Sequence, residues 1–173
     1  EYKLRSVEMF WACLPLETYP SEELDSLWKK LLINQFHDII PGSSINLVYQ
    51  TTHKEYEEIH ESCDRLKNKA GQALFDDDPD SFVLANTLSY PWQGMVHVPE
   101  SFSGYSILDE NGQPVPLQET TGGFAAAVNL KPLSFTTFSK GDSVKSGMKK
   151  GERLTLENDL IRYEFDNNGQ LVS

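Results

Sequence analysis

The stretch WKKLLINQFHDIIPGSS, residues 28–44, ends one amphipathic helix and turns the chain into the next. Its apolar residues recur at helical spacing, and Pro41-Gly42 stops the pattern, because proline breaks the helical hydrogen bonding and glycine accepts a left-handed backbone. His37 and Asp38 stand side by side just before that stop. The stretch therefore predicts two helices joined by a rigid turn that carries an imidazole and a carboxylate.

The helical pattern extends on both sides of that turn and covers residues 1–75. Before the turn, a first helix ends at Pro15, and Ser21 can cap the second helix. After the turn, Ser43 or Ser44 can cap a third helix, whose apolar stripe is about eight turns long at 3.6 residues per turn. This stripe comprises Ile45, Val48, Tyr49, Thr52, Tyr56, Ile59, Cys63, Leu66, Ala70 and Ala73. We therefore expect a three-helix domain over residues 1–75.

The second half, residues 80–173, has the pattern of short β-strands separated by turn residues. An acidic run with a proline, residues 76–80, marks the linker before it. Asn111-Gly112 predicts a hairpin, because this pair accepts positive φ. The expected strands are 81–85, 95–98, 105–109, 115–119, 124–130, 133–138, 154–156, 160–165 and 171–172. The fold class is thus α+β: three helices followed by the first part of an antiparallel β-sandwich, truncated and with open edges.

Charge and composition exclude several classes of partner. The net charge of -11 repels phosphate backbones and anionic membrane surfaces, so we expect neither nucleic acid nor a membrane as a partner. No apolar run approaches the length of a membrane span. The two cysteines, Cys13 and Cys63, lie far apart and form no CxxC pair, which fits free thiols in a reducing compartment better than a disulfide. A cytoplasmic location is the expectation.

The His37-Asp38 pair admits two interpretations. Imidazole is a common zinc ligand, and a rigid helix end is a good place to hold one. Alternatively, the ring meets a backbone carbonyl and the aspartate caps the turn. The pair by itself favours this second, structural interpretation, because motifs this short match by chance.

The longer sequence around the pair closely resembles the middle region of glycoside hydrolase family 38, the α-mannosidases. Gln35-Phe36-His37-Asp38 followed by Pro41-Gly42-Ser43-Ser44 is similar to the bacterial and cytosolic branch. Weaker similarity continues in residues 84–89, LANTLS, and in residues 156–166. The resemblance covers most of the chain, but only the first stretch is specific.

The resemblance implies a zinc-dependent retaining hydrolase of terminal α-mannosides. His37 matches one of the family's four zinc ligands, and Asp38 matches a residue that contacts the sugar or supports the metal. The other ligands, a His-x-Asp pair and a second aspartate that is also the nucleophile, belong to an N-terminal catalytic domain, and this sequence contains no His-x-Asp. We therefore expect a fragment that begins inside a longer enzyme, contains no catalytic residue and is inactive alone. Its partners are then an α-mannoside and the missing domain, with a homo-oligomer possible.

Two rival functions remain open at this point. One is a non-catalytic, carbohydrate-binding or adhesive module, and the other is a family 38 hydrolase of mannosylated solutes such as mannosylglycerate. A role for His37 in zinc binding requires its side chain to project from the bundle instead of packing in the core.

Other polar groups carry weaker signals. His53, Glu57 and His60 share a helix face and match half of a di-iron pattern, but a solvated face gives the same spacing. His97 is expected on the outer face of a strand. Tyr90-Pro91-Trp92 could stack on a sugar, although packing is the commoner role of such a loop.

Overall fold

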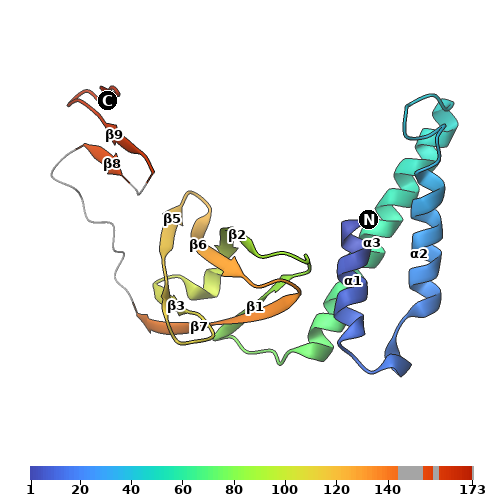
Figure 1. Ribbon diagram of the computed structural model, residues 1–173, viewed down its shortest axis with the longest axis horizontal. Helices are drawn as coiled ribbons and strands as arrows, with labels where there is room; N and C mark the ends of the chain where they lie inside the picture. Colours follow the sequence, from blue (N-terminus) through green and yellow to red (C-terminus); the bar gives the residue numbers. More distant parts are fainter. Residues whose placement is uncertain (144–153, 158–159, 173) are drawn as a thin grey trace.

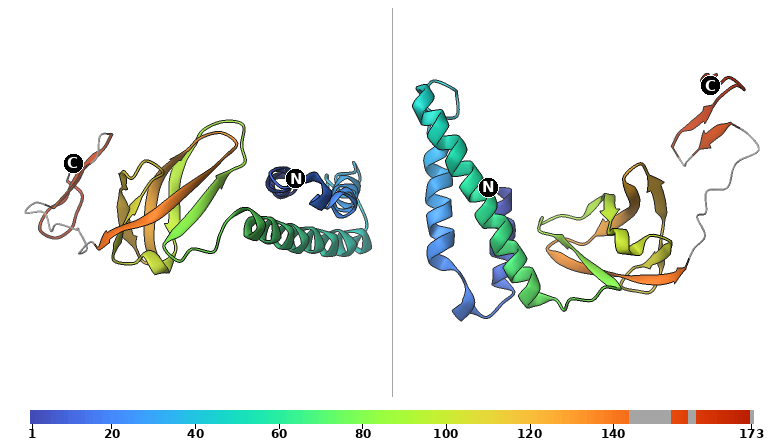
Figure 2. Two further views of the ribbon diagram at one scale, coloured as in Figure 1. Left: turned by 90° about the horizontal axis from the view of Figure 1, so that it is seen from below. Right: turned by 180° about the vertical axis from the view of Figure 1, so that it is seen from behind.

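The computed structural model describes residues 1–143, 154–157 and 160–172. Its first part consists of α1 (Tyr2–Ala12), a short 3-10 helix η1 (Leu16–Thr18), α2 (Ser21–Asn34) and the long α3 (Asn46–Leu74). The three α-helices form one arm of the molecule, and α1 and α2 lie side by side against α3 (Figure 1, Figure 2). None of the described helices is long and apolar enough to cross a membrane.

The helical core lies where all three helices meet. The apolar residues at helical spacing on each helix face this core. The polar group of the buried Trp11 has a partner there, because the indole Nε1 donates to the carbonyl of Leu66 at 3.2 Å. The buried core comprises Leu4, Val7, Trp11, Leu24, Leu27, Leu31, Ile59, Cys63, Leu66 and Ala70. The expected three-helix arrangement is therefore present, with its core on the C-terminal half of α3.

The helix ends differ from the prediction. The second helix ends at Asn34, well before Pro41, and no serine side chain caps α2 or α3. The residue before α3 is Ile45. It was expected in the core stripe of the third helix, but its side chain is exposed. The reason is local: the hydroxyls of Ser43 and Ser44 both donate to the carbonyl of Asp38, so they close the preceding turn instead of capping the next helix.

The second part is a β-sandwich of antiparallel sheets, which confirms the α+β class. Within the described residues one sheet has the order β1-β7-β3-β4 and the facing sheet has the order β2-β6-β5, with β8 and β9 paired separately. The strands are β1 (Ser81–Asn86), β2 (Trp92–Val98), β3 (Tyr105–Leu108), β4 (Pro114–Val115), β5 (Leu117–Thr120), β6 (Gly123–Leu130), β7 (Ser134–Ser143), β8 (Thr155–Glu157) and β9 (Arg162–Glu164), with the 3-10 helix η2 (Glu100–Phe102) between β2 and β3.

Side chains from both sheets fill one common core. Alternate residues of β6 point inward, and Phe102 of η2 closes the layer, with its ring 5.0 Å from that of Phe82. The buried residues are Val98, Phe102, Ile107, Ala126, Val128, Leu130 and Phe138. His97 is exposed on β2, as expected, whereas Trp92 packs against this core.

Two of the predicted strands are wrong in detail. The segment 115–119 is two strands, β4 and β5, which belong to different sheets, because Pro116 between them has no N–H to continue the ladder. The end of the chain forms only an isolated bridge from Leu171 to Phe165, not a strand. The Asn111-Gly112 hairpin joins β3 to β4 as predicted, although only Gly112 has positive φ, at 72°.

Candidate functional site

The segment that joins α2 to α3 lies at the tip of the helical arm, at the end away from the sandwich (Figure 1), and His37 and Asp38 belong to this segment. The side chain of His37 is 77% exposed and that of Asp38 is 62% exposed, so both project from the bundle. The imidazole Nε2 lies 3.5 Å from Asp38 Oδ1, and the ring of Phe36 packs on the imidazole at 4.2 Å between centroids. The structure thus brings the two sequence-predicted residues together on an open surface.

A small hydrogen-bond network fixes the backbone beneath the pair. Ser44 Oγ donates to the Asp38 carbonyl at 2.7 Å, and the Ser44 N–H donates to Tyr49 Oη at 3.0 Å. Tyr49 Oη in turn donates to the Ile39 carbonyl at 3.4 Å. Gly42 allows the reversal with φ of 84°. The turn is therefore tied to α3, while the imidazole and the carboxylate above it face solvent.

The pair fits one part of a zinc site and not a whole one. A structural or catalytic zinc ion takes three or four protein ligands. Among the residues that the structure describes, no three His, Cys, Asp or Glu side chains are grouped closely enough to hold a metal. His37 can supply one nitrogen donor and Asp38 a neighbouring oxygen. The same finding removes support for a di-iron site at His53, Glu57 and His60, which lie exposed on α3.

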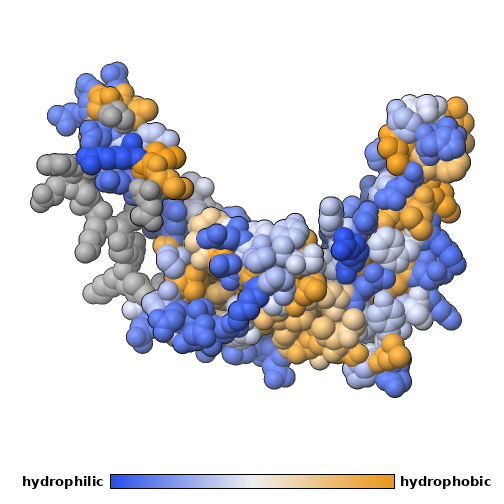
Figure 3. Space-filling view, viewed as in Figure 1, coloured by the Kyte–Doolittle hydropathy of each residue, from blue (hydrophilic) through white to orange (hydrophobic). Residues whose placement is uncertain are grey.

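An apolar collar surrounds this turn, and the sequence analysis missed it. We define the collar as Ile33, Phe36, Ile40, Ile45 and Leu47, whose exposed fractions run from 53% to 69%. Figure 3 shows apolar surface on this part of the helical arm. Large side chains so exposed beside one another mark contact surfaces in proteins. The signal was in the sequence, because Ile33, Ile40 and Leu47 fall outside the core-facing stripes.

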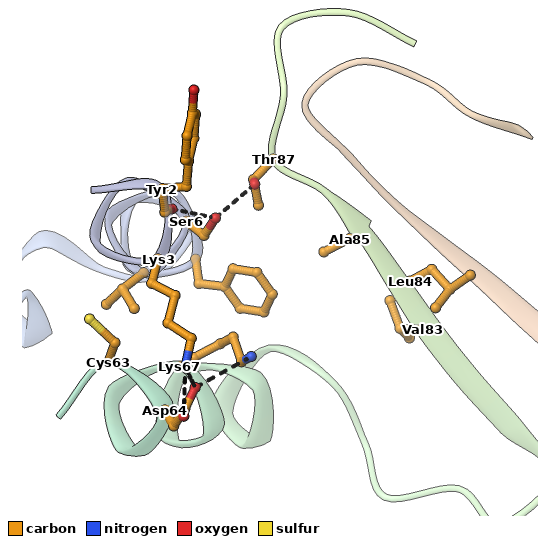
Figure 4. Close-up of a pocket in the computed structure, with 12 residues that line it drawn as sticks. Tyr2, Lys3, Ser6, Cys63, Asp64, Lys67, Val83, Leu84, Ala85 and Thr87 are labelled. Atoms are coloured by element: carbon orange, nitrogen blue, oxygen red, sulfur yellow. Dashed lines mark hydrogen bonds and ion pairs between the residues drawn. The ribbon is translucent and has the colours of Figure 1, made fainter. Parts of the chain in front are cut away.

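A cavity of about 460 Å³ lies between the helical arm and the sandwich, where it separates α1 and α3 from β1 (Figure 4). On its helical side, Lys3 Nζ binds both carboxylate oxygens of Asp64 at 2.9 and 3.0 Å. That hydrogen bond lowers the pKa of Asp64. Across the joint, Ser6 Oγ and Thr87 Oγ1 share a hydrogen bond of 2.8 Å.

The groups around this cavity connect the two parts of the fold. Burial raises the pKa of the Cys63 thiol, which keeps it protonated and unreactive. Beside the cavity the ring of Phe135 meets those of Phe10 and Phe75 at 5.0 and 5.1 Å. Phe10 therefore faces the sandwich, and it is only half-buried because it also lines the cavity.

The helices and the turn match a known domain. The model of the alpha mannosidase middle domain family covers residues 1–74. Residues 1–74 are thus similar to this family. The matched stretch includes all three α-helices, the His37-Asp38 turn and the apolar collar.

Curated relatives extend the similarity beyond the middle domain. Alpha-mannosidase 2C1 of Homo sapiens is 27% identical and that of Mus musculus 29% identical over 157 residues, 90% of this chain. Alpha-mannosidase of Saccharomyces cerevisiae is 33% identical over 75 residues, 42% of the chain and 7% of that protein. The chain spans only 14% of the length of the human and mouse relatives.

Proposed function

We propose that this chain is part of a zinc-dependent, retaining exo-α-mannosidase of glycoside hydrolase family 38 that cleaves terminal α-mannosides. The observation that carries the proposal is that the matched middle domain contains an exposed histidine on a rigid turn. The relatives with similarity over 90% of the chain bear the name alpha-mannosidase, which supports a glycoside hydrolase.

In this proposal His37 provides one zinc ligand. Its ring is exposed, and the ring of Phe36 contacts one side of it at a tilted angle, which restricts the orientation of the imidazole. Asp38 is placed to accept a hydrogen bond from a sugar hydroxyl or to support the metal. Zinc, when bound, coordinates sugar hydroxyls and helps to orient the ring. The remaining ligands come from another part of the longer protein.

The two catalytic carboxylates also lie outside this chain in our proposal. Retention requires a nucleophile and an acid about 5 Å apart across the glycosidic bond. The acidic linker does not offer such a pair, because Asp78 Oδ1 accepts a hydrogen bond of 2.9 Å from the Asp80 N–H and is engaged in a turn. We therefore expect the isolated chain to be inactive.

The apolar collar supports a partner domain at this end of the bundle. Burial of apolar surface contributes a favourable free energy of about 25 cal/mol per Å². Docking of the catalytic domain on the collar would bring its ligands to His37 and would cover exposed isoleucines and leucine. A cytoplasmic location completes the proposal, and it is supported by free Cys13 and Cys63, one of them exposed.

The test uses the longer natural protein that contains this chain. Zinc content is measured by atomic emission and activity with 4-nitrophenyl α-mannoside, for the natural protein, His37→Ala and His53→Ala. We expect His37→Ala to lose zinc and more than about 100-fold in activity, since even outer-shell partners of a metal are worth about 10–100-fold. His53→Ala, an exposed histidine on α3, should match the natural protein. Full zinc and activity in His37→Ala would refute the assignment.

A further inference from the structure

Two loops of the chain share the pattern Asp-x-Asn-Gly-Gln, at residues 109–113 and 166–170. In each loop Oδ1 of the aspartate accepts hydrogen bonds from the N–H groups two and four residues on, at 2.8 Å and 2.8 Å from Asp109 and at 2.8 Å and 2.9 Å from Asp166. In each the glycine is left-handed, with φ of 72° and 77°. The same local sequence therefore builds the same loop twice.

An asparagine followed by glycine is chemically labile, because glycine has no Cβ to shield its backbone nitrogen. That nitrogen loses its proton and attacks Cγ of the asparagine side chain. A new C–N bond closes a succinimide ring, the Cγ–Nδ2 bond breaks, and the amide nitrogen leaves as ammonia. Water then opens the ring at either carbonyl to give aspartate or isoaspartate. The sum is amide plus water to carboxylate plus ammonium, with no oxidant or reductant.

Both folded loops restrain the attacking nitrogen. The Gly112 N–H donates to the Asp109 carbonyl at 2.9 Å, and the Gly169 N–H donates to the Asp166 carbonyl at 3.0 Å. The reaction therefore requires the loop to open first. The observed rate is then the rate in an open chain multiplied by the fraction of molecules in which that loop is open.

The two loops differ in what holds them closed. The loop at 109–113 joins β3 to β4, and β3 also pairs with β7 and carries the fully buried Ile107. Lys131 Nζ binds Glu110 Oε1 in this loop at 2.7 Å. The loop at 166–170 joins β9 to a single bridge at Leu171, whose side chain is 58% exposed, and the Val172 N–H donates to the Glu164 carbonyl at 2.8 Å. Among the residues that the structure describes, β8 is the only strand paired with β9. Within this part of the chain, opening of the second loop therefore disrupts less packing than opening of the first.

We propose that Asn168 is a site of spontaneous covalent modification, while Asn111, in the same local sequence, is protected by the sheet that holds its loop. Conversion of Asn168 adds one negative charge. As isoaspartate it also lengthens the backbone between the N–H groups of Asn168 and Gln170, which both bind Asp166 Oδ1. After this change the two N–H groups can no longer both donate to Asp166 Oδ1 in the present geometry.

The experiment is a time course of the whole chain in mildly alkaline buffer, followed by peptide mapping with mass spectrometry. Each conversion raises the mass of its peptide by one dalton, and isoaspartate separates from aspartate by chromatography. We expect Asn168 to convert roughly tenfold or more faster than Asn111, which requires about 1.4 kcal/mol less free energy for opening. Asn168→Gln should abolish the signal from that peptide and leave the rate at Asn111 unchanged.

A parallel time course in concentrated urea is the matched control, because both loops are then open. There the two rates should agree to within about twofold, as the residue after each glycine is also the same. Equal rates in the folded chain, or a faster Asn111, would overturn the proposal. So would a ratio that persists in urea, because the local sequence and not the fold would then set it.

Discussion

The two halves of helix α3 have different surroundings. From Ile59 to the C-terminal end, the core residues of α3 are at most 4% exposed and pack against α1 and α2; they are Ile59, Cys63, Leu66 and Ala70. In the N-terminal half, Leu47 is 66% exposed beside the turn that carries His37. The difference shows that one end of the helix forms the core of the bundle. The other end presents an exposed apolar surface beside the His37-Asp38 pair.

The largest effect should come from the enclosed half. We expect Leu66→Ala to lower the free energy of unfolding by about 2–5 kcal/mol, because it leaves a cavity in a closely packed core. Leu47→Ala, the same change on the exposed half, should alter it by less than about 0.5 kcal/mol. Urea denaturation followed by circular dichroism measures both. Similar midpoints for the two variants would contradict the comparison.

A smaller effect is expected where the end of α2 contacts the middle of α3. Asn34 is 2% exposed, and its Nδ2 donates to the Lys30 carbonyl at 2.9 Å and to Glu55 Oε2 at 2.6 Å. Asn34→Ala should cost about 1–3 kcal/mol, because it removes two hydrogen bonds of a buried amide to part-buried acceptors, one of them a carboxylate. The matched control is Asn46→Ala on the exposed half, where we expect almost no change in the denaturation midpoint. A loss as large in the control would show that burial does not decide the cost.

Within the exposed half, the turn should depend on one hydroxyl. Tyr49→Phe removes the group that accepts from the Ser44 N–H and donates to the Ile39 carbonyl. We expect a cost of about 1 kcal/mol and a roughly fivefold faster hydrogen exchange at the Ser44 amide. Tyr56→Phe, on the same helix but against the core, should leave that exchange unchanged. Unaltered exchange in Tyr49→Phe would mean that the turn is held by other groups.

The smallest effect concerns the Lys3–Asp64 pair at the enclosed half. The hydrogen bond from Lys3 holds the pKa of Asp64 below its usual 3.8 in the folded chain. A depressed carboxyl pKa gives stability that is present above 3.8 and is lost as the pH falls through the lower, folded value. The melting temperature of the natural chain should therefore exceed that of Asp64→Asn slightly at neutral pH. This gap should close at strongly acidic pH and shrink in high salt, since both side chains are about half exposed. A gap independent of pH would exclude this linkage.

The sequence alone predicted the order of the helices and of most strands, and it proposed the residues of the candidate site. Helical periodicity and turn residues act over a few positions, so the three helices, the Asn111-Gly112 hairpin and the exposed His37 turn could all be predicted. The helix ends could not be predicted. A serine hydroxyl at position 43 or 44 can accept a hydrogen bond from the start of the next helix or donate one to the preceding turn, and only the folded turn selects the Asp38 carbonyl as the partner.

Tertiary structure decided which surfaces meet. Pro116 moves the chain from one sheet to the other, and Phe135 of β7 joins Phe10 of α1, although these residues are far apart in sequence. Ile45 has the spacing of a core residue, yet no described helix lies over it. Periodicity shows which face of each helix or strand is apolar. Whether that face is buried depends on whether another element packs over it, and this is set by contacts between segments that are distant in sequence.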